Sequence, residues 1–367
     1  MVISSLKYTN SSEVRIQSKT CPSILVGMKF IEANHNQIYS EFQRNGRITR
    51  CFYCGKEEGI VASHSITEKR CLDLLTEPIE GERGVYGFKH LKLSRANWHN
   101  PYHFADFEIV GTKKASTFKG FCKAHDQNLF QLLDNSNFDE SSMECKFRHC
   151  YRAFAKAIHT KNEELESCNK DSIYKEQYKT YIIERKEDIE IGLNLDIQGY
   201  EFLMNKWMEK KDYTQLNHVC FRTNKFHPIA SASFCQPTFT INNNRINDYK
   251  QTDTPLNHIF INIVPESEGT YILISCFKNQ PNSMKFLSEL NEVYRIDKDR
   301  FGRFLTTLLI FYTENTFMAP SLVNSLPDSL RRNLLLNLKH SITDGIQNLF
   351  LDKPINGSLN LFENQFG

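Results

Sequence analysis

Hydrophobic and polar positions follow a helical period over the middle of the chain. Four large apolar residues recur at steps of three and four positions: Phe147, Tyr151, Phe154 and Ile158. This spacing places them on one face of a helix. Ser141 or Ser142 is suited to the N-cap of this helix, and Glu144 falls in its first turn. Residues 172–195 and 199–212 show similar patterning with charged outer faces, so we predict a helical hairpin or small bundle over 137–212.

After residue 213 the pattern changes to short runs that are rich in β-branched and aromatic residues. These runs are 218–224, 231–242, 258–265 and 270–277. They predict strands, and the short polar segment between the last two predicts a hairpin. Helical periodicity returns at 284–294, 299–314 and 325–342. The pattern as a whole predicts an α+β fold.

A chain of 367 residues is longer than one ordinary hydrophobic core requires. Changes in pattern divide it into an N-terminal segment, a region rich in Cys and His, a helical region and an α+β domain. The predicted ranges are 1–48, 49–136, 137–212 and 213–367. No repeat of fixed period is present, which argues against a solenoid.

Composition is that of a globular protein, with 40% hydrophobic and 24% charged residues. The net charge of +2 neither favours nor excludes a nucleic-acid partner, so any basic patch would be local. The N-terminus lacks the long apolar stretch of a secretory signal. The most apolar segment, 301–323, is interrupted by Arg303, Glu314 and Asn315, so we expect a buried helix with no membrane contact. The 11 irregularly spaced cysteines favour reduced thiols in the cytoplasm.

Two short clusters carry the residues of a candidate metal site. Cys51 and Cys54 form a Cys-x-x-Cys pair, and Cys122 and His125 form a second pair with the same spacing. Zinc prefers four tetrahedral sulfur and nitrogen ligands, and such a turn presents two of them together. Gly55 suits the turn that follows Cys54. We predict a structural zinc site. The alternative is a set of unrelated buried thiols with a surface histidine.

His64 follows a short apolar run, residues 60–62, that predicts a strand leading away from the first cysteine pair. A histidine at a strand end beside a metal site is suited to general-base catalysis, because its unperturbed pKa lies near neutrality. Taken alone, a histidine is more often structural or exposed.

The order of these features resembles the zinc-bearing branch of the HNH, or His-Me finger, nucleases. In that family two strands and a helix form a ββα-metal unit. The resemblance implies that His64 activates water. It also implies that Asp126, directly after His125, holds a catalytic Mg²⁺ or Mn²⁺ at the start of a helix over 126–134. Thr117 takes the place of the family's asparagine.

The chain departs from this family in two respects that concern the catalytic metal. Ser63 stands where the family usually has an aspartate ligand, and serine is a poorer ligand. Residues of about 70–110 form an insertion between the two cysteine pairs. This insertion contains four residues that could supply the missing ligand, although packing or surface roles are commoner: His90, His99, His103 and Asp106.

The resemblance predicts a metal-dependent endonuclease acting on nucleic acid, on DNA rather than RNA. The chain is also similar to uncharacterised bacterial proteins with an amino-terminal zinc module of this kind, which suggests a role in defence against phage. The first alternative is a non-catalytic zinc module that binds nucleic acid or protein. A zinc hydrolase is disfavoured because four protein ligands leave zinc no open position for water.

Regions outside the zinc module could bind partners. Arg148, Arg152 and Lys156 recur every four residues and could follow a nucleic-acid backbone, or they could form a solvated helix face. The C-terminal α+β domain could bind a protein partner.

Overall fold

The computed structural model describes residues 41, 44–79, 81–90, 105–170, 179–249, 254–343 and 359–366. Its strands are β1 Ile60–His64, β2 Glu77–Ile79, β3 Glu82–His90, β4 Ala105–Val110, β5 Thr117–Cys122, β6 Leu216–Arg222, β7 Ile229–Cys235, β8 Ile259–Glu266, β9 Gly269–Phe277 and β10 Thr316–Met318. Its helices and helical turns are η1 Glu68–Leu72, α2 Asp73–Leu75, α3 Lys123–Asn135, α4 Met143–Asn169, α5 Lys179–Ile191, η3 Gly192–Ile197, α6 Gln198–Lys210, η4 Tyr213–Gln215, α7 Pro281–Ile296, α8 Lys298–Tyr312, α9 Pro320–Ser325 and α10 Asp328–Thr343. The predicted α+β class is confirmed.

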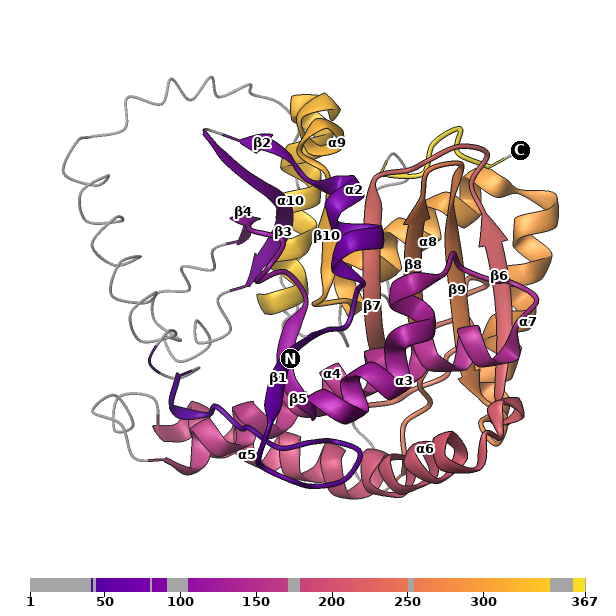
Figure 1. Ribbon diagram of the computed structural model, residues 1–367. Helices are drawn as coiled ribbons and strands as arrows, with labels where there is room; N and C mark the ends of the chain where they lie inside the picture. The colour runs from indigo at the N-terminus through magenta and orange to yellow at the C-terminus, as the bar shows by residue number, and fades with distance from the viewer. Residues whose placement is uncertain are drawn as a thin grey trace, which may run out of the picture.

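The strands form two antiparallel sheets (Figure 1). The small sheet pairs β1 with β5, and the large sheet has eight strands in the order β2-β3-β10-β7-β8-β9-β6, with β4 paired to β3. β8 and β9 form the predicted hairpin, in which Glu266 pairs with Gly269. Three strands of the large sheet, β2, β3 and β4, come from the segment expected as an insertion. They reach the C-terminal strands because β10 pairs with both β3 and β7.

The central strands of the large sheet are buried on both faces. Successive side chains of a strand point to opposite faces, so Phe260 and Leu273 belong to one hydrophobic cluster and Ile261 and Ile272 to the other. Helix α4 packs on the first face against β7 and β8, and α7 packs on the second against β9 and β6. Two covered faces explain why these strands read as nearly continuous apolar runs rather than alternating ones.

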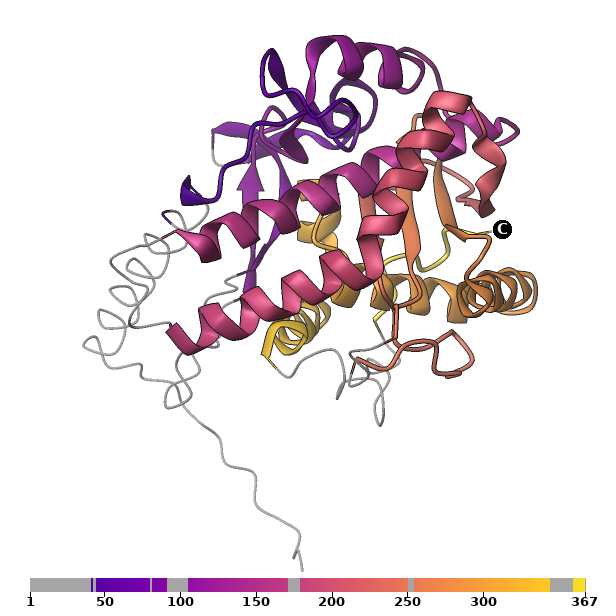
Figure 2. The same ribbon diagram turned by 90° about the horizontal axis from the view of Figure 1, so that it is seen from below.

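Helix α4 connects the small sheet to the large one. Its N-cap is Ser142, whose side chain accepts a hydrogen bond from the Cys145 amide, as the sequence predicted for Ser141 or Ser142. Its buried aromatic residues contact the first cysteine turn through Phe52, whose ring lies 5.8 Å from Tyr151 and 5.9 Å from Phe154. Helix α4 contacts both β5 of the small sheet and β7 of the large one, and its long axis is seen in the foreground of Figure 2.

The predicted domain boundaries stay predictions, although one hydrophobic cluster includes Cys51 of the first cysteine turn, Phe154 of α4 and Phe277 of β9. Most of the N-terminal segment lies outside the described residues, as do His99 and His103. His90 pairs with Ala105 in the β3–β4 register. The Asp106 carboxylate accepts a hydrogen bond from the neighbouring Phe107 amide. Among the described helices, none combines the length and the apolar character needed to cross a bilayer.

Candidate metal centre

The first half of the candidate centre is a tight turn that contains Cys51 and Cys54. The Gly55 amide donates to the Cys51 carbonyl at 2.8 Å, and the Cys51 amide donates to the Lys56 carbonyl at 2.7 Å. Gly55 has a φ of +73°, in the left-handed region that glycine adopts without a steric penalty. The turn therefore needs a glycine where the sequence has one.

The second half lies where β5 passes into α3. Cys122 is the last residue of β5 and the N-cap position of α3, so His125 falls in the first helical turn. Two main-chain hydrogen bonds join the halves: the Phe52 amide to the Gly120 carbonyl at 2.7 Å, and the Lys123 amide to the Gly59 carbonyl at 3.0 Å. The backbone thus holds the two halves of the centre together.

The four predicted ligands meet at one point. One ligand atom from each of Cys51, Cys54, Cys122 and His125 lies within 4.8 Å of all the others. His125 Nδ1 is 3.6 Å from Cys51 Sγ and 3.2 Å from Cys122 Sγ. Tetrahedral zinc with bonds of about 2.0–2.3 Å places its ligand atoms about 3.5–3.8 Å apart. The cluster therefore fits a structural zinc ion.

The two cysteines of the first turn have different surroundings. Burial raises the pKa of the Cys51 thiol, and hydrogen bonds from the main chain of Cys122, Cys54 and Tyr53 act in the opposite direction. Cys54 is exposed. Slight burial raises its pKa, but hydrogen bonds, the Lys56 amide first among them, outweigh this and lower the pKa overall. A zinc ion needs both as thiolates, and its charge would stabilise the buried one.

His64 lies at the end of β1, directly opposite Thr117 of β5 in the antiparallel register. Its Nδ1 is 3.0 Å from the carbonyl oxygen of Ala115. A carbonyl can only accept, so this contact assigns the proton of the neutral imidazole to Nδ1. The lone pair is then on Nε2, which lies 3.5 Å from Oε2 of Glu68. His64 therefore presents its basic nitrogen towards a carboxylate.

Burial lowers the pKa of His64, while Glu68 and the Ala115 carbonyl raise it to a smaller extent. Arg152 lowers this pKa further and Asp134 raises it. Burial is the largest of these effects, so the neutral imidazole, the form that can accept a proton, is favoured.

Asp126 and Ser63, the two predicted ligand positions for the catalytic metal, each have an unsatisfied polar atom. Oδ1 of Asp126 and Oγ of Ser63 are buried, and neither has a hydrogen-bond partner in the structure. Asp126 belongs to the first turn of α3, whereas Asp134, which influences the pKa of His64, lies near the end of the same helix. That Asp126 and His64 share one cleft stays a prediction.

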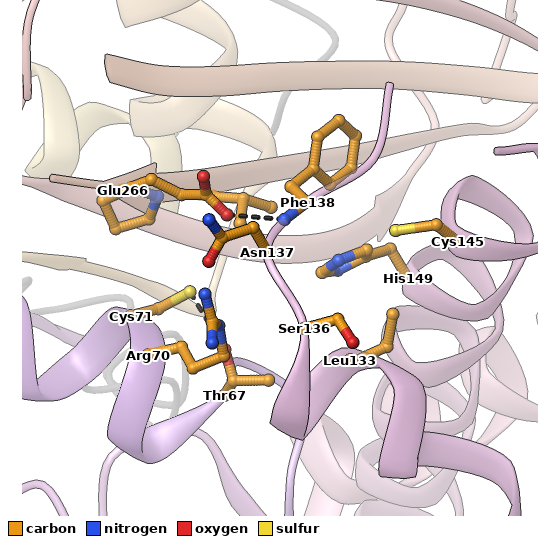
Figure 3. A pocket seen from close by; sticks show the side chains of 12 residues that line it. Thr67, Arg70, Cys71, Leu133, Ser136, Asn137, Phe138, Cys145, His149 and Glu266 are labelled. Atoms are coloured by element: carbon orange, nitrogen blue, oxygen red, sulfur yellow. Dashed lines mark hydrogen bonds between the residues drawn. The ribbon is translucent and has the colours of Figure 1, made fainter. Parts of the chain in front are cut away.

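A pocket with about 260 Å³ of space, including open solvent, lies between η1, the end of α3, α4 and β8 (Figure 3). Its polar lining includes Arg70 of η1, Thr67 directly before η1, His149 of α4 and Glu266 of β8. Glu266 accepts a hydrogen bond from the Phe138 amide at 2.5 Å. Neither His64 nor Asp126 lines this pocket.

The basic residues of α4 have partners inside the fold. Arg148 binds Glu144, and Arg152, only 3% exposed, binds Asp134 at 2.9 Å. The Lys156 ammonium donates to the carbonyl of Thr117 at 3.2 Å. Arg152 is buried, so it can neither contact a nucleic-acid backbone nor form part of a solvated helix face. These side chains hold α3 and β5 against α4.

Three residues around this strand end have no counterpart in the predicted site. Glu68 contacts His64, whereas Ser116 and Asn315 contact Ile66 and Ser65, which follow it. Glu68 follows His64 by four positions, but a strand-to-turn boundary between them removes the helical spacing that would have indicated a contact. In the sequence, the only signal for Asn315 was that it interrupts an apolar segment as a polar residue.

Comparison of the chain with known protein families, with curated proteins and with solved structures gives no match.

Proposed function

We propose that this chain is a metal-dependent endonuclease in which a zinc-fixed ββα unit presents His64 as the general base. The observation that carries the proposal is the hydrogen bond of 3.0 Å between His64 Nδ1 and the Ala115 carbonyl, which leaves Nε2 as the proton acceptor. The cluster of four potential zinc ligands lies at the other end of the same pair of strands, where Ile60 pairs with Cys122.

In this proposal His64 Nε2 takes a proton from the attacking water. Glu68, with Oε2 3.5 Å from Nε2, then faces a positive imidazolium and stabilises it. The neutral state of His64 before reaction follows from its burial, which lowers its pKa.

A divalent cation such as Mg²⁺ or Mn²⁺, when bound, would neutralise the phosphate and stabilise the leaving oxygen. Asp126 would hold it, since Oδ1 of Asp126 is a buried acceptor without a hydrogen-bond partner. Ser63 Oγ has the same property but carries no charge. Mg²⁺ keeps several waters, so one carboxylate and the substrate phosphate can suffice.

DNA rather than RNA is the proposed substrate class, and the resemblance to bacterial proteins with a similar zinc module supports defence against phage as the setting. The alternative is a zinc-stabilised module that binds nucleic acid or protein without cleaving it. Ser63 favours this alternative, because it puts a hydroxyl in place of a carboxylate at one position of the predicted metal site. Ser63 is also only 1% exposed.

The test compares cleavage of plasmid, single-stranded DNA and RNA by the wild type, His64→Gln and His159→Gln, with Mg²⁺ or Mn²⁺. His159 is a matched control, because its Nε2 also faces a glutamate four positions later, at 3.2 Å. His64→Gln should lower kcat by about 10²–10⁴-fold with zinc content unchanged, and His159→Gln should retain activity. Equal cleavage by the wild type and His64→Gln, or no cleavage of any substrate, would overturn the proposal.

A further inference from the structure

We infer that Asn315 is a positioning residue for the imidazole of His64, acting through Ser65, Ser116 and the Ala115 carbonyl. The inference rests on the proposed role of His64 as the base. Asn315 follows α8 and directly precedes β10, 250 positions after Ser65 in the sequence.

The Ala115 carbonyl that accepts from His64 is oriented by the next residue, Ser116. Ser116 has a φ of +58°, in the left-handed region that residues with a Cβ rarely adopt. Such a conformation persists only where surrounding contacts determine it, and it occurs preferentially at functional sites. If Ser116 relaxed to negative φ, the adjoining peptide and its carbonyl would turn away from Nδ1.

Ser116 is held by the two residues that follow His64. The Ser65 amide and hydroxyl lie 3.1 Å and 3.2 Å from the Ser116 carbonyl oxygen. The Ser116 hydroxyl accepts from the Ile66 amide at 3.1 Å and lies 3.2 Å from the Ile66 carbonyl oxygen. All three residues are buried, so water does not replace these hydrogen bonds.

Asn315 fixes the Ser65 hydroxyl. Its Nδ2 lies 2.8 Å from Ser65 Oγ and 2.8 Å from the carbonyl oxygen of Ala232 in β7. An amide nitrogen can only donate, so the Ser65 hydroxyl accepts here and its one proton is directed to the Ser116 carbonyl. The main chain of Asn315 is also anchored, because its carbonyl accepts from the Ala232 amide at 3.2 Å. A central strand of the large sheet thereby determines the geometry around His64.

The test uses three variants: Asn315→Ala, Asn315→Asp and the control Asn247→Ala. Asp has nearly the shape of Asn but cannot donate, so it separates the loss of hydrogen bonds from the loss of volume. Asn247 is a matched control, because its Nδ2 donates to two main-chain carbonyls, those of Pro237 and Asn257. Asn247 directly follows Ile246, a member of the other hydrophobic cluster.

The first readout is the ¹⁵N chemical shifts of the His64 ring at a fixed neutral pH, with its signals assigned by their loss in His64→Gln. The wild type should show the Nδ1–H tautomer. Asn315→Ala and Asn315→Asp should both show a mixture of tautomers with normal zinc content, and Asn247→Ala should match the wild type. The second readout is cleavage, for which both Asn315 variants should lower kcat by about ten- to a hundredfold while KM stays near its wild-type value.

The two readouts separate this inference from the proposed function. If the wild type cleaves nothing but the tautomer of His64 changes only in the Asn315 variants, the positioning inference stands and the nuclease proposal falls. If the wild type cleaves and the Asn315 variants keep both the wild-type tautomer and kcat, the positioning inference is wrong. It is equally wrong if Asn247→Ala changes the tautomer as much.

Discussion

At the scale of single residues, the cysteines of this chain differ in what their surroundings allow. Ten cysteines lie in the described part of the chain, and all are free of disulfide bonds. Cys51 is 1% exposed and forms a cluster with Cys54, Cys122 and His125. Cys71 is 3% exposed and accepts a hydrogen bond from the Thr67 hydroxyl at 3.0 Å. Two thiols with similar burial therefore have different surroundings: Cys51 lies among potential metal ligands, whereas Cys71 lies beside a hydroxyl.

Removal of one zinc ligand should show this difference. Cys51→Ala should lower bound zinc from about one equivalent per chain to less than about a tenth, because three ligands hold the ion poorly. Cys71→Ala is the matched control: burial raises the pKa of Cys71 to about 11, so this thiol stays protonated, and zinc content should be unchanged. Elemental analysis of the purified proteins measures both. Normal zinc in Cys51→Ala would contradict the assignment of the centre.

At the scale of elements, α4 connects the candidate metal centre to the large sheet. It has 27 residues, and its buried face contacts α3, β5, β7 and β8. The first turn leaves amides without helical partners, and the Ser142 hydroxyl accepts from one of them, at Cys145. The neighbouring Ser141 hydroxyl instead donates to the Asp139 carboxylate at an exposed position. Of the two serines, only Ser142 caps the start of the helix.

Ser142→Ala should lower the free energy of unfolding by about 1 kcal/mol, the usual cost of losing an N-cap. Ser141→Ala provides the control and should change this free energy by less than about 0.5 kcal/mol, since its hydroxyl is exposed. Urea unfolding followed by circular dichroism compares the two variants. Equal effects of the two substitutions would show that the cap does not determine the start of α4.

At the scale of the whole molecule, helices cover both faces of the large sheet and bury histidines in the interior. His149 of α4 faces one cluster through its contact with Phe138, and His258 stacks on Phe234 with ring centroids 4.6 Å apart. Burial lowers the pKa of both to about 3, and it lowers the pKa of His227 to about 4. All three are therefore neutral in the native state at any pH near neutrality.

These histidines should make the protein sensitive to acid. The unfolded chain takes up a proton at each histidine below about pH 6.5, whereas the native state does not until about pH 3–4. Stability is thus fully present above about pH 6.5 and is lost as the pH falls towards about 3–4, by about 1.4 kcal/mol per pH unit for each histidine. Urea unfolding between pH 7.5 and 5.5, with zinc content monitored, measures this slope.

The variant His258→Gln removes one titrating group and should flatten the slope of stability against pH by about a third of the contribution of the three histidines. The absolute stability of the variant is a separate quantity, because the ring contact with Phe234 is lost at every pH. An unchanged slope would mean that His258 is not the neutral, buried group that its surroundings indicate.

The sequence by itself determined the elements whose signal is local. Runs rich in β-branched and aromatic residues predicted β6 to β9, and helical periodicity predicted α4 to α8 and α10. The paired spacing of Cys51 with Cys54 and of Cys122 with His125 predicted a metal cluster that the structure brings together. These features depend on residues only a few positions apart, so the backbone geometry of a strand, a helix or a turn is enough to relate them. Only the pairing of the two halves of the cluster was a long-range prediction, and it followed from the preference of zinc for four ligands.

Only the tertiary structure decided which distant segments meet. The supposed insertion contributes β2, β3 and β4 to the large sheet, and Asn315 lies against Ser65, next to His64. No local pattern records such contacts, because strand pairing and buried hydrogen bonds depend on how whole elements pack and not on the spacing along the chain. The chemical groups are therefore encoded one by one in the sequence, while their arrangement around His64 is set by the packing of the whole fold.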